Sequence, residues 1–226
     1  MPRPSSILAG MSAPSPHPFP TRIIQAVGTF VLRPLVLFVF RVRVRRSWRR
    51  HEGACVYAAN HRSFFDPPFV GMWVRDPLSY FARADLWNNV FFRFLLGMMH
   101  GIPVNREHPG MSSMKGAVDR LRHGISVLVF PEGTRTRTGR VGTMRDGPAL
   151  FARRAGVPVI PVYVHRTELC WPRGAILPRL SGGRIEIRFG SPLIAPAHLA
   201  PRLQDAWVTR RLSRWMQVQE RDLFRG

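Results

Sequence analysis

The chain has 226 residues, of which 45% are hydrophobic and 11% aromatic, so it is long enough to bury a core and too apolar to be disordered. Its 34 Lys and Arg against 13 Asp and Glu give a formal net charge of +21, and its two cysteines exclude a disulfide framework. Such a charge requires an anionic partner, for which nucleic acid, anionic lipid, a phosphorylated substrate and an acidic carrier protein are the candidates.

The first 40 residues divide into two segments. Residues 1–22 are rich in Pro and Ser, which predicts a disordered tail. Residues 23–40 are apolar over about the ~17–25 residues that a membrane span needs, but Arg33 and Pro34 interrupt them. We therefore expect a helical, membrane-associating segment that lies in the interface or is inserted, and a helix buried against the domain is the alternative.

A basic segment follows directly. Arginine and valine alternate over Arg41–Arg46, which predicts a strand with one basic face, and Arg49 and Arg50 extend the charge. Next to an apolar anchor, this positive charge favours binding to an anionic membrane surface. The positive-inside rule then predicts that the following domain lies on the cytoplasmic face of a bacterial membrane. A solvated basic strand without a partner is the alternative.

From residue 54 onward, short apolar runs alternate with helical patterns. The alternation predicts an α/β fold, a mixed sheet flanked by helices in a single domain over residues 41–226. Strands are predicted at Ala54–Ala59, Leu78–Ala82, Gly101–Asn105, Ser126–Pro131, Val157–Val164 and Arg184–Gly190, and helices at Pro67–Val74, Asp85–Leu96, Pro109–Arg122, Pro148–Ala155 and Pro201–Leu223.

The first reactive segment follows the strand that ends at Ala59. His61 would emerge where the strand stops, and Asp66 comes five residues later, before two prolines. A histidine beside a carboxylate is a general-base pair suited to removing a proton from a hydroxyl. Asp before Pro is also an ordinary helix N-cap, so Asp66 could cap its helix, orient His61, or do both.

The second reactive segment is Phe130–Arg135, with the sequence FPEGTR, after the strand that begins at Ser126. Gly133 permits a turn whose backbone N–H groups can hold an anion, and Thr134 and Arg135 add donors for a phosphate. Arg106 follows a third strand. Because ligands of α/β sheets bind beyond the carboxyl ends of the strands, we expect these segments to converge in one crevice, although a plain turn with solvated charges is the alternative.

In combination these motifs resemble the 1-acylglycerol-3-phosphate O-acyltransferase family of glycerolipid acyltransferases. His61 to Asp66 matches the H-x4-D motif of that family, with Asn60 before it, and Phe130–Arg135 matches the F-P-E-G-T-R motif. Gly101–Arg106 resembles the second motif and Val157–Val162 the fourth. The resemblance covers about residues 41–190, whereas Arg145 stands where the family usually has a lysine.

The resemblance implies roles for these residues. His61 would be the general base on the acceptor hydroxyl, and Asp66 would orient it. The acceptor phosphate would be held by Glu132, Gly133, Thr134, Arg135 and Arg106, supported by Asn60 and Arg145, and the fourth motif would line the path of the acyl donor.

The resemblance also implies the partners and the location. Acyl-CoA or acyl-carrier protein would be the co-substrate, lysophosphatidic acid the acceptor and phosphatidic acid the product. Neither a cofactor nor a metal is predicted, because the sequence has no metal-ligand cluster. We expect the bacterial cytoplasmic membrane as the location and no nucleic acid as partner. Another lysolipid, such as lyso-ornithine lipid, or glycerol 3-phosphate remains an alternative acceptor.

Overall fold

The computed structural model describes residues 33–47, 51–74, 77–83, 88, 90, 101–104, 111–171, 179 and 184–224. Within these ranges helices and strands alternate along the chain. Their bounds are α2 (Arg33–Phe40), β1 (Arg43–Arg46), β2 (Val56–Ala59), α3 (Asp66–Gly71), β3 (Leu78–Arg83), β4 (Ile102–Val104), α5 (Met111–Arg122), β5 (Ser126–Val129), α6 (Gly147–Ala155), β6 (Val159–His165), α7 (Thr167–Cys170), β7 (Glu186–Phe189) and α8 (Pro201–Phe224).

The described strands form one seven-stranded mixed sheet in the order β1-β7-β6-β2-β5-β3-β4. Strand β2 lies between β6 and β5 and is parallel to both, and β3 is parallel to β5 and to β4. Only the pair β6 and β7 is antiparallel among the described pairings. The carboxyl ends of β2, β5 and β6 therefore meet at one edge of the sheet, where the chemistry-bearing loops begin.

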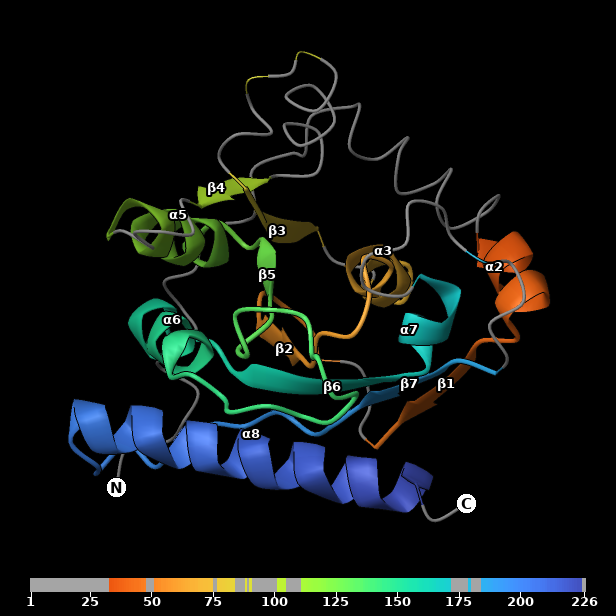
Figure 1. The fold of residues 1–226 in the computed structure, drawn as a ribbon. Helices are drawn as coiled ribbons and strands as arrows, with labels where there is room; N and C mark the ends of the chain where they lie inside the picture. Colours follow the sequence, from red (N-terminus) through yellow and green to blue (C-terminus); the bar gives the residue numbers. More distant parts are fainter. Residues whose placement is uncertain are drawn as a thin grey trace.

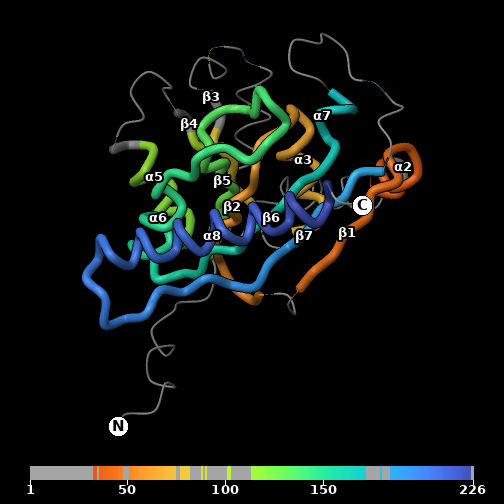
Figure 2. The backbone as a smooth tube through the Cα atoms, turned by 60° about the horizontal axis from the view of Figure 1, so that its bottom comes forward, coloured from red at the N-terminus to blue at the C-terminus, as the bar shows by residue number. Residues whose placement is uncertain are grey.

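Helices cover both faces of this sheet, as Figures 1 and 2 show. Successive side chains of a strand point to opposite faces. Accordingly Tyr57 and Ala59 of β2 pack in a core with α2 and α3, whereas Val56 and Ala58 pack in a second core with α5, α6 and α8. All four residues of β2 are buried, which explains why this strand reads as a continuous apolar run.

The structure confirms the predicted α/β class and the mixed sheet flanked by helices. Each predicted strand is present with its ends shifted by up to two residues, and the helices α3, α5, α6 and α8 lie where periodicity placed them. The short helix α7 was not predicted, because four residues are too few to show a helical period. The predicted helix Asp85–Leu96 and the predicted tail 1–22 lie largely or wholly outside the described residues.

Of the apolar stretch 23–40, the structure describes the part from Arg33 onward. Helix α2 begins at Arg33, next to Pro34, as expected from a proline that suits the first turn of a helix. Among the described helices none combines the length and the apolar character needed to cross a bilayer.

Candidate active site

The candidate site lies at the carboxyl ends of β2 and β5, which are neighbours in the sheet. Asn60 is the first residue after β2 and is buried. Its side-chain amide donates to the carbonyl oxygen of Val164 (2.9 Å) and accepts from the Val164 N–H (2.7 Å). Asn60 thereby ties the end of β2 to β6 and fixes the point from which His61 leaves the sheet.

His61 and Asp66 are in direct contact, as their spacing predicted. His61 Nδ1 lies 2.8 Å from Asp66 Oδ2, and the imidazole stacks on the Phe130 ring with 4.1 Å between centroids. The carboxylate can only accept, so Nδ1 carries the proton and the lone pair is on Nε2. The His61 side chain is 18% exposed, whereas the Asp66 side chain is fully buried. The imidazole is therefore accessible to a substrate, and the carboxylate that orients it is not.

The Asp66 carboxylate is surrounded by donors. Its Oδ2 also accepts from the backbone N–H groups of Arg62 (2.6 Å) and Ser63 (2.7 Å), and its Oδ1 accepts from the Thr167 hydroxyl (2.5 Å). The Asp66 carboxylate therefore fixes both the backbone of the turn at residues 61–63 and the orientation of the imidazole.

The N-cap interpretation of Asp66 is wrong. Asp66 is the first residue of α3, Phe65 occupies the N-cap position, and no side chain caps this helix. The physical reason is that the carboxylate folds back over the preceding turn, where three N–H groups converge on Oδ2 and the Thr167 hydroxyl donates to Oδ1.

The loop after β5 holds the backbone of His61 on both sides. The Glu132 carboxylate accepts from the His61 N–H (2.9 Å) through Oε1 and from the Gly142 N–H (3.0 Å) through Oε2. The carbonyl oxygen of His61 accepts from the Thr136 N–H (2.8 Å). Burial raises the pKa of Glu132, and the two backbone N–H donors act in the opposite direction. Glu132 thus braces the loop, and its oxygens already have backbone partners where a phosphate ligand was expected.

Gly133 occupies the left-handed region of the backbone, with φ +72°. A Cβ at this position would lie 3.3 Å from the guanidinium carbon of Arg145, so the absence of a side chain lets that guanidinium approach the turn. The Arg145 N–H also donates to the carbonyl oxygen of Pro131 (3.1 Å). The structure therefore brings Arg145 to the predicted phosphate-binding turn, next to exposed Gly133 and Thr134.

Arg135 lies against the ring of Phe64, with its guanidinium carbon 3.7 Å from the ring centroid. Phe64 belongs to the turn between His61 and Asp66, and it contacts Trp171 on its other side. The N–H groups of an arginine stacked on an aromatic face lie in the plane of its guanidinium and point sideways from the contact. The contact between Arg135 and Phe64 joins the two predicted motifs into one site. The hydrogen bond between Glu132 and the His61 N–H, across 71 residues, joins them a second time.

Two sequence predictions, for Arg106 and for the fourth motif, stay predictions. Arg106 lies outside the described residues. Residues 159–162 of the Val157–Val162 motif form the amino-terminal part of β6, all of whose residues are buried. The role of this motif in lining the path of the acyl donor stays a prediction.

Sequence reasoning missed several participants. Thr167 and Trp171 approach from around α7, and Arg62 reaches Glu168 (3.0 Å) and the Tyr163 hydroxyl (2.9 Å). Thr167 and Arg62 make these contacts across about 100 residues, so no local pattern could have indicated them. Within the described ranges no cluster of His, Cys, Asp and Glu could hold a metal ion.

Comparison with known proteins agrees with this geometry. The family model described as Acyltransferase matches residues 41–165, more than half of the chain. A 1-acyl-sn-glycerol-3-phosphate acyltransferase from Pseudomonas aeruginosa is 29% identical over 192 residues, which cover 80% of this chain and 72% of that protein. The enzyme of that name from Bacillus subtilis is 28% identical over 175 residues, or 76% of this chain and 84% of that protein.

Among solved structures, the crystal structure of the 1-acyl-sn-glycerophosphate (LPA) acyltransferase PlsC from Thermotoga maritima has the same fold. It superposes with a TM-score of 0.64 at 20% identity, covering 87% of this chain and 78% of that one. The family match includes His61, Asp66 and the whole Phe130–Arg135 turn. The chain therefore belongs to the acyltransferase family and is an acyl-transferring enzyme.

Proposed function

We propose that this enzyme moves a fatty acyl chain from acyl-CoA or acyl-carrier protein to the free hydroxyl of 1-acyl-glycerol 3-phosphate, which gives phosphatidic acid in phospholipid biosynthesis. The observation that carries the proposal is the 2.8 Å contact between His61 and Asp66 beside the Gly133–Arg135 turn. The names of the relatives from Pseudomonas aeruginosa and Bacillus subtilis support the acceptor.

The chemistry follows from the tautomer of His61. Nε2 accepts the proton of the acceptor hydroxyl as its oxygen attacks the thioester carbonyl carbon, and Asp66 stabilises the imidazolium that forms. The carbon–sulfur bond then breaks, and the imidazolium returns its proton to the leaving thiolate. No covalent acyl-enzyme is required, so Ser63 needs no nucleophilic role; its hydroxyl donates to the Trp171 carbonyl oxygen (3.1 Å).

The acceptor phosphate is assigned to the turn after β5. Gly133 and Thr134 are exposed there, the Arg145 guanidinium lies next to Gly133, and the Arg135 guanidinium lies on the Phe64 ring. Two cations beside this exposed turn suit a dianionic phosphate. We assign Arg106 to the same phosphate from the family resemblance alone, and Glu132 to positioning the loop.

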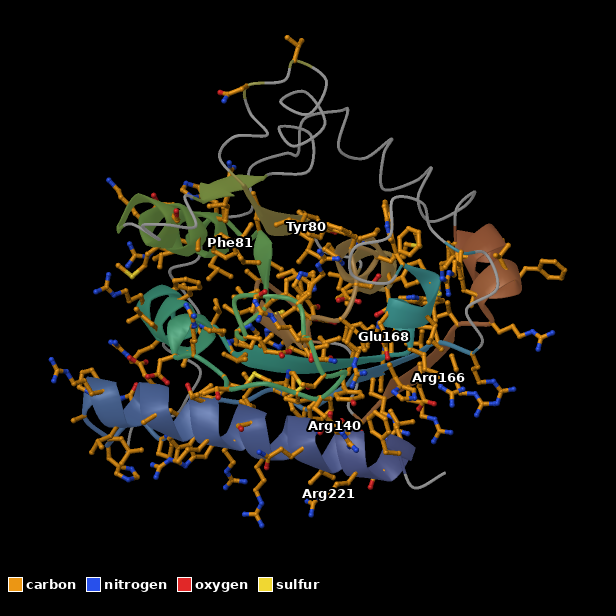
Figure 3. The ribbon with its side chains drawn as sticks, viewed as in Figure 1. Tyr80, Phe81, Arg140, Arg166, Glu168 and Arg221 are labelled. Carbon is orange, nitrogen blue, oxygen red and sulfur yellow. The ribbon has the colours of Figure 1, made fainter. Side chains whose placement is uncertain are left out.

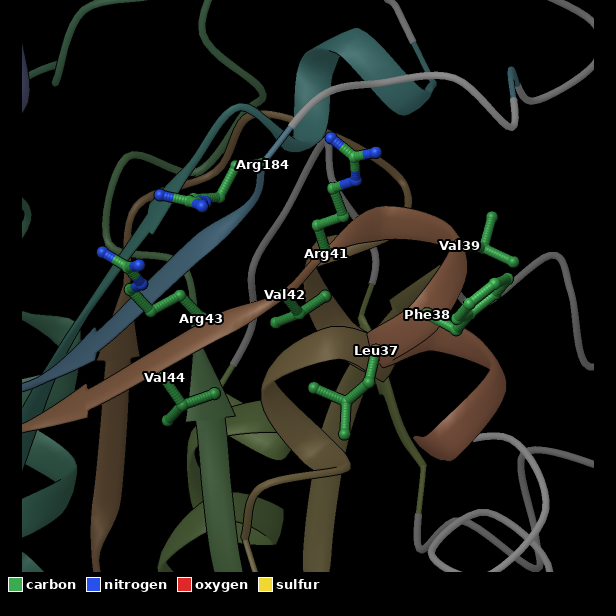
Figure 4. A pocket seen from close by; sticks show the side chains of 8 residues that line it. All are labelled: Leu37, Phe38, Val39, Arg41, Val42, Arg43, Val44 and Arg184. Atoms are coloured by element: carbon green, nitrogen blue, oxygen red, sulfur yellow. The ribbon is translucent and has the colours of Figure 1, made fainter.

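Location at the bacterial cytoplasmic membrane, with the catalytic domain on its cytoplasmic face, is part of the proposal. A groove of about 880 Å³ lies between α2 and β1. Its arginines Arg41, Arg43 and Arg184 have no ion-pair partner in the part of the chain that the structure describes, and Phe38 beside them is 86% exposed. In Figure 4 the three guanidinium groups point away from Phe38 and Leu37, an arrangement that suits anionic headgroups next to acyl chains.

Acyl transfer by the purified protein in detergent tests the proposal. Labelled acyl-CoA and acyl-carrier protein are offered with a panel of acceptors: lysophosphatidic acid, glycerol 3-phosphate, another lysophospholipid and lyso-ornithine lipid. We expect product from lysophosphatidic acid and loss of turnover by roughly 10³-fold or more in His61→Ala. Wild-type turnover in His61→Ala would refute the mechanism, and activity confined to phosphate-free acceptors would refute the acceptor.

A further inference from the structure

The C-terminal helix α8 lies below the sheet in the view of Figure 1, and a side chain near its end contacts the candidate active site. Glu220, one turn before its end, is the residue that makes the contact. Its Oε1 accepts from the backbone N–H of Val141 (2.8 Å) and lies 3.7 Å from Nη2 of Arg62. Its side chain is 13% exposed and that of Arg62 is 1% exposed, so the charges attract in a poorly solvated place.

These contacts close a ring around the backbone of His61. The His61 N–H donates to one oxygen of Glu132, and the other oxygen of Glu132 accepts from the Gly142 N–H. Gly142 follows Val141, whose N–H donates to Glu220, and Glu220 pairs with Arg62. Arg62 follows His61, so the path returns to its starting residue. Each loop that carries a motif is thus tied both to the other loop and to α8.

Side chains around Glu220 strengthen the same contact. The guanidinium carbon of Arg140 lies 4.3 Å from the centroid of the Phe224 ring, and the His165 ring meets Phe224 edge-on at 5.6 Å. Figure 3 places Arg140 on the sheet side of α8 and Arg221 on the opposite side. The last turn of α8 is therefore seated against the loop after β5 rather than only against the core.

We infer that Glu220 is a positioning residue of the acyl transfer and that α8 is part of the catalytic unit. The inference rests on the proposed function, because its effect is exerted through His61. Without the Glu220 carboxylate, Val141 loses its acceptor and Arg62 loses one of its two carboxylate partners. The backbone on both sides of the imidazole is then less restrained, and catalytic geometry is sensitive to displacements of about 1 Å.

The test uses the whole chain, four single variants and the double variant Glu132→Gln/Glu220→Ala. Glu220→Ala removes the acceptor and the charge, Glu220→Gln keeps an acceptor for Val141 but removes the charge, and Glu132→Gln weakens another link of the ring. Asp222→Asn is the matched control, because Asp222 lies on the same helix, is 56% exposed on its side chain and faces Arg188 at 3.7 Å, outside the ring.

We expect Glu220→Ala to lower kcat by roughly 10- to 100-fold with little change in KM for lysophosphatidic acid, and Glu220→Gln to recover part of that loss. Because both residues act in one ring, the fold-loss of kcat in the double variant Glu132→Gln/Glu220→Ala should be smaller than the product of the fold-losses in the two single variants. Rates are compared well below the unfolding temperature of each variant, and Glu220→Gln, the isosteric change, carries the test if Glu220→Ala does not fold.

Two results would overturn the inference: turnover of both Glu220 variants equal to that of Asp222→Asn, or losses of Glu132→Gln and Glu220→Ala that multiply. If His61→Ala is inactive while Glu220→Ala is not impaired, only the role of α8 is refuted. If His61→Ala is fully active, the proposed function itself is refuted.

Discussion

Arg135 illustrates how a side chain is prepared for a ligand before the ligand arrives. A free arginine has many rotamers, and ordering them on binding costs up to about 2 kcal/mol. Here the guanidinium already lies on the Phe64 ring, 3.7 Å from its centroid, and Phe64 itself packs on Trp171. The aromatic residue within the first motif therefore orders the cation of the second.

Phe64→Leu tests this coupling. Leucine keeps an apolar contact but has no aromatic face, so we expect KM for lysophosphatidic acid to rise roughly 5-fold, about 1 kcal/mol, with kcat nearly unchanged. Steady-state kinetics measure both constants. An acceptor without a phosphate serves as the internal control, and an equal rise in its KM would contradict the assignment of Arg135 to the phosphate.

His165 predicts a dependence of stability on pH. Burial, followed by the charges of Arg62 and Arg166, lowers the pKa of His165 to about 4, while Glu186 acts in the opposite direction and Arg188 adds to the lowering. Since the unfolded histidine titrates near 6.5, the unfolded chain takes up a proton between these values that the folded chain does not. The free energy of unfolding is therefore unaffected by this group above pH 6.5, and it decreases as the pH falls from 6.5 toward 4.

His165→Phe should remove that loss. Between pH 7 and pH 5 we expect the unfolding free energy of the wild type to fall by roughly 2 kcal/mol more than that of the variant. Urea unfolding at both pH values measures the difference. His198→Gln, a change at an exposed histidine, is the control, and equal slopes for wild type and His165→Phe would contradict the prediction.

At the scale of elements, α8 is held to the rest of the domain by a charged pair as well as by its apolar face. Val208, Leu212 and Met216 are buried at helical spacing in the core shared with α6. Beside them Arg153 of α6 meets Asp205 of α8 through two parallel hydrogen bonds of 2.8 and 2.9 Å. This bidentate pair sets the position of α8 along its axis, which in turn places Glu220.

Asp205→Ala should therefore destabilise the fold. It leaves a half-buried guanidinium without its carboxylate, and we expect a loss of roughly 2 kcal/mol in unfolding free energy. Asp222→Asn removes a carboxylate that is 56% exposed and lies 3.7 Å from Arg188, which keeps Glu186 as a partner, so it should cost under about 0.5 kcal/mol. Denaturant unfolding measures both losses. Similar losses would show that the Arg153–Asp205 pair stabilises the fold no more than the Arg188–Asp222 pair does.

At the scale of the whole molecule, we expect the charge of +21 to favour binding to an anionic lipid surface. The groove between α2 and β1 combines arginines that have no ion-pair partner among the described residues with exposed apolar residues. It lies at the edge of the sheet, because β1 is an edge strand in the described sheet. Enzymes that act on lipids must reach the bilayer, so this edge is the part of the molecule that we expect to face it.

Sedimentation with vesicles tests that orientation. We expect the double variant Arg43→Gln/Arg184→Gln to bind vesicles of anionic phospholipid roughly 30-fold more weakly than the wild type, because each of the two arginines near such a surface contributes about 1 kcal/mol. Lys115→Gln/Arg154→Gln, an equal charge change on α5 and α6, is the control. Binding should weaken with salt, and equal losses in the two double variants would mean that net charge, not the groove, decides.

Local sequence patterns were sufficient for the described strands and for most of the described helices, but not for the short helix α7. Alternation and helical spacing predicted β2, β5 and α8 to within about two residues, and the five-residue spacing of His61 and Asp66 predicted their contact. They were insufficient for the role of Glu132, expected on the phosphate and found bonded to two backbone N–H groups. They also suggested a cap for α3 that Asp66 does not form.

The amino-acid sequence by itself thus determined the class of fold and the reactive residues, because periodicity and short motifs act over a few residues of chain. Only the tertiary structure decided what surrounds them: Thr167 on Asp66 across 101 residues, Glu132 on His61 across 71, and Glu220 on Val141 across 79. These contacts depend on the order β6-β2-β5 and on the placement of α8 beneath it, since strand order and helix docking arise from burying both faces of the sheet at once.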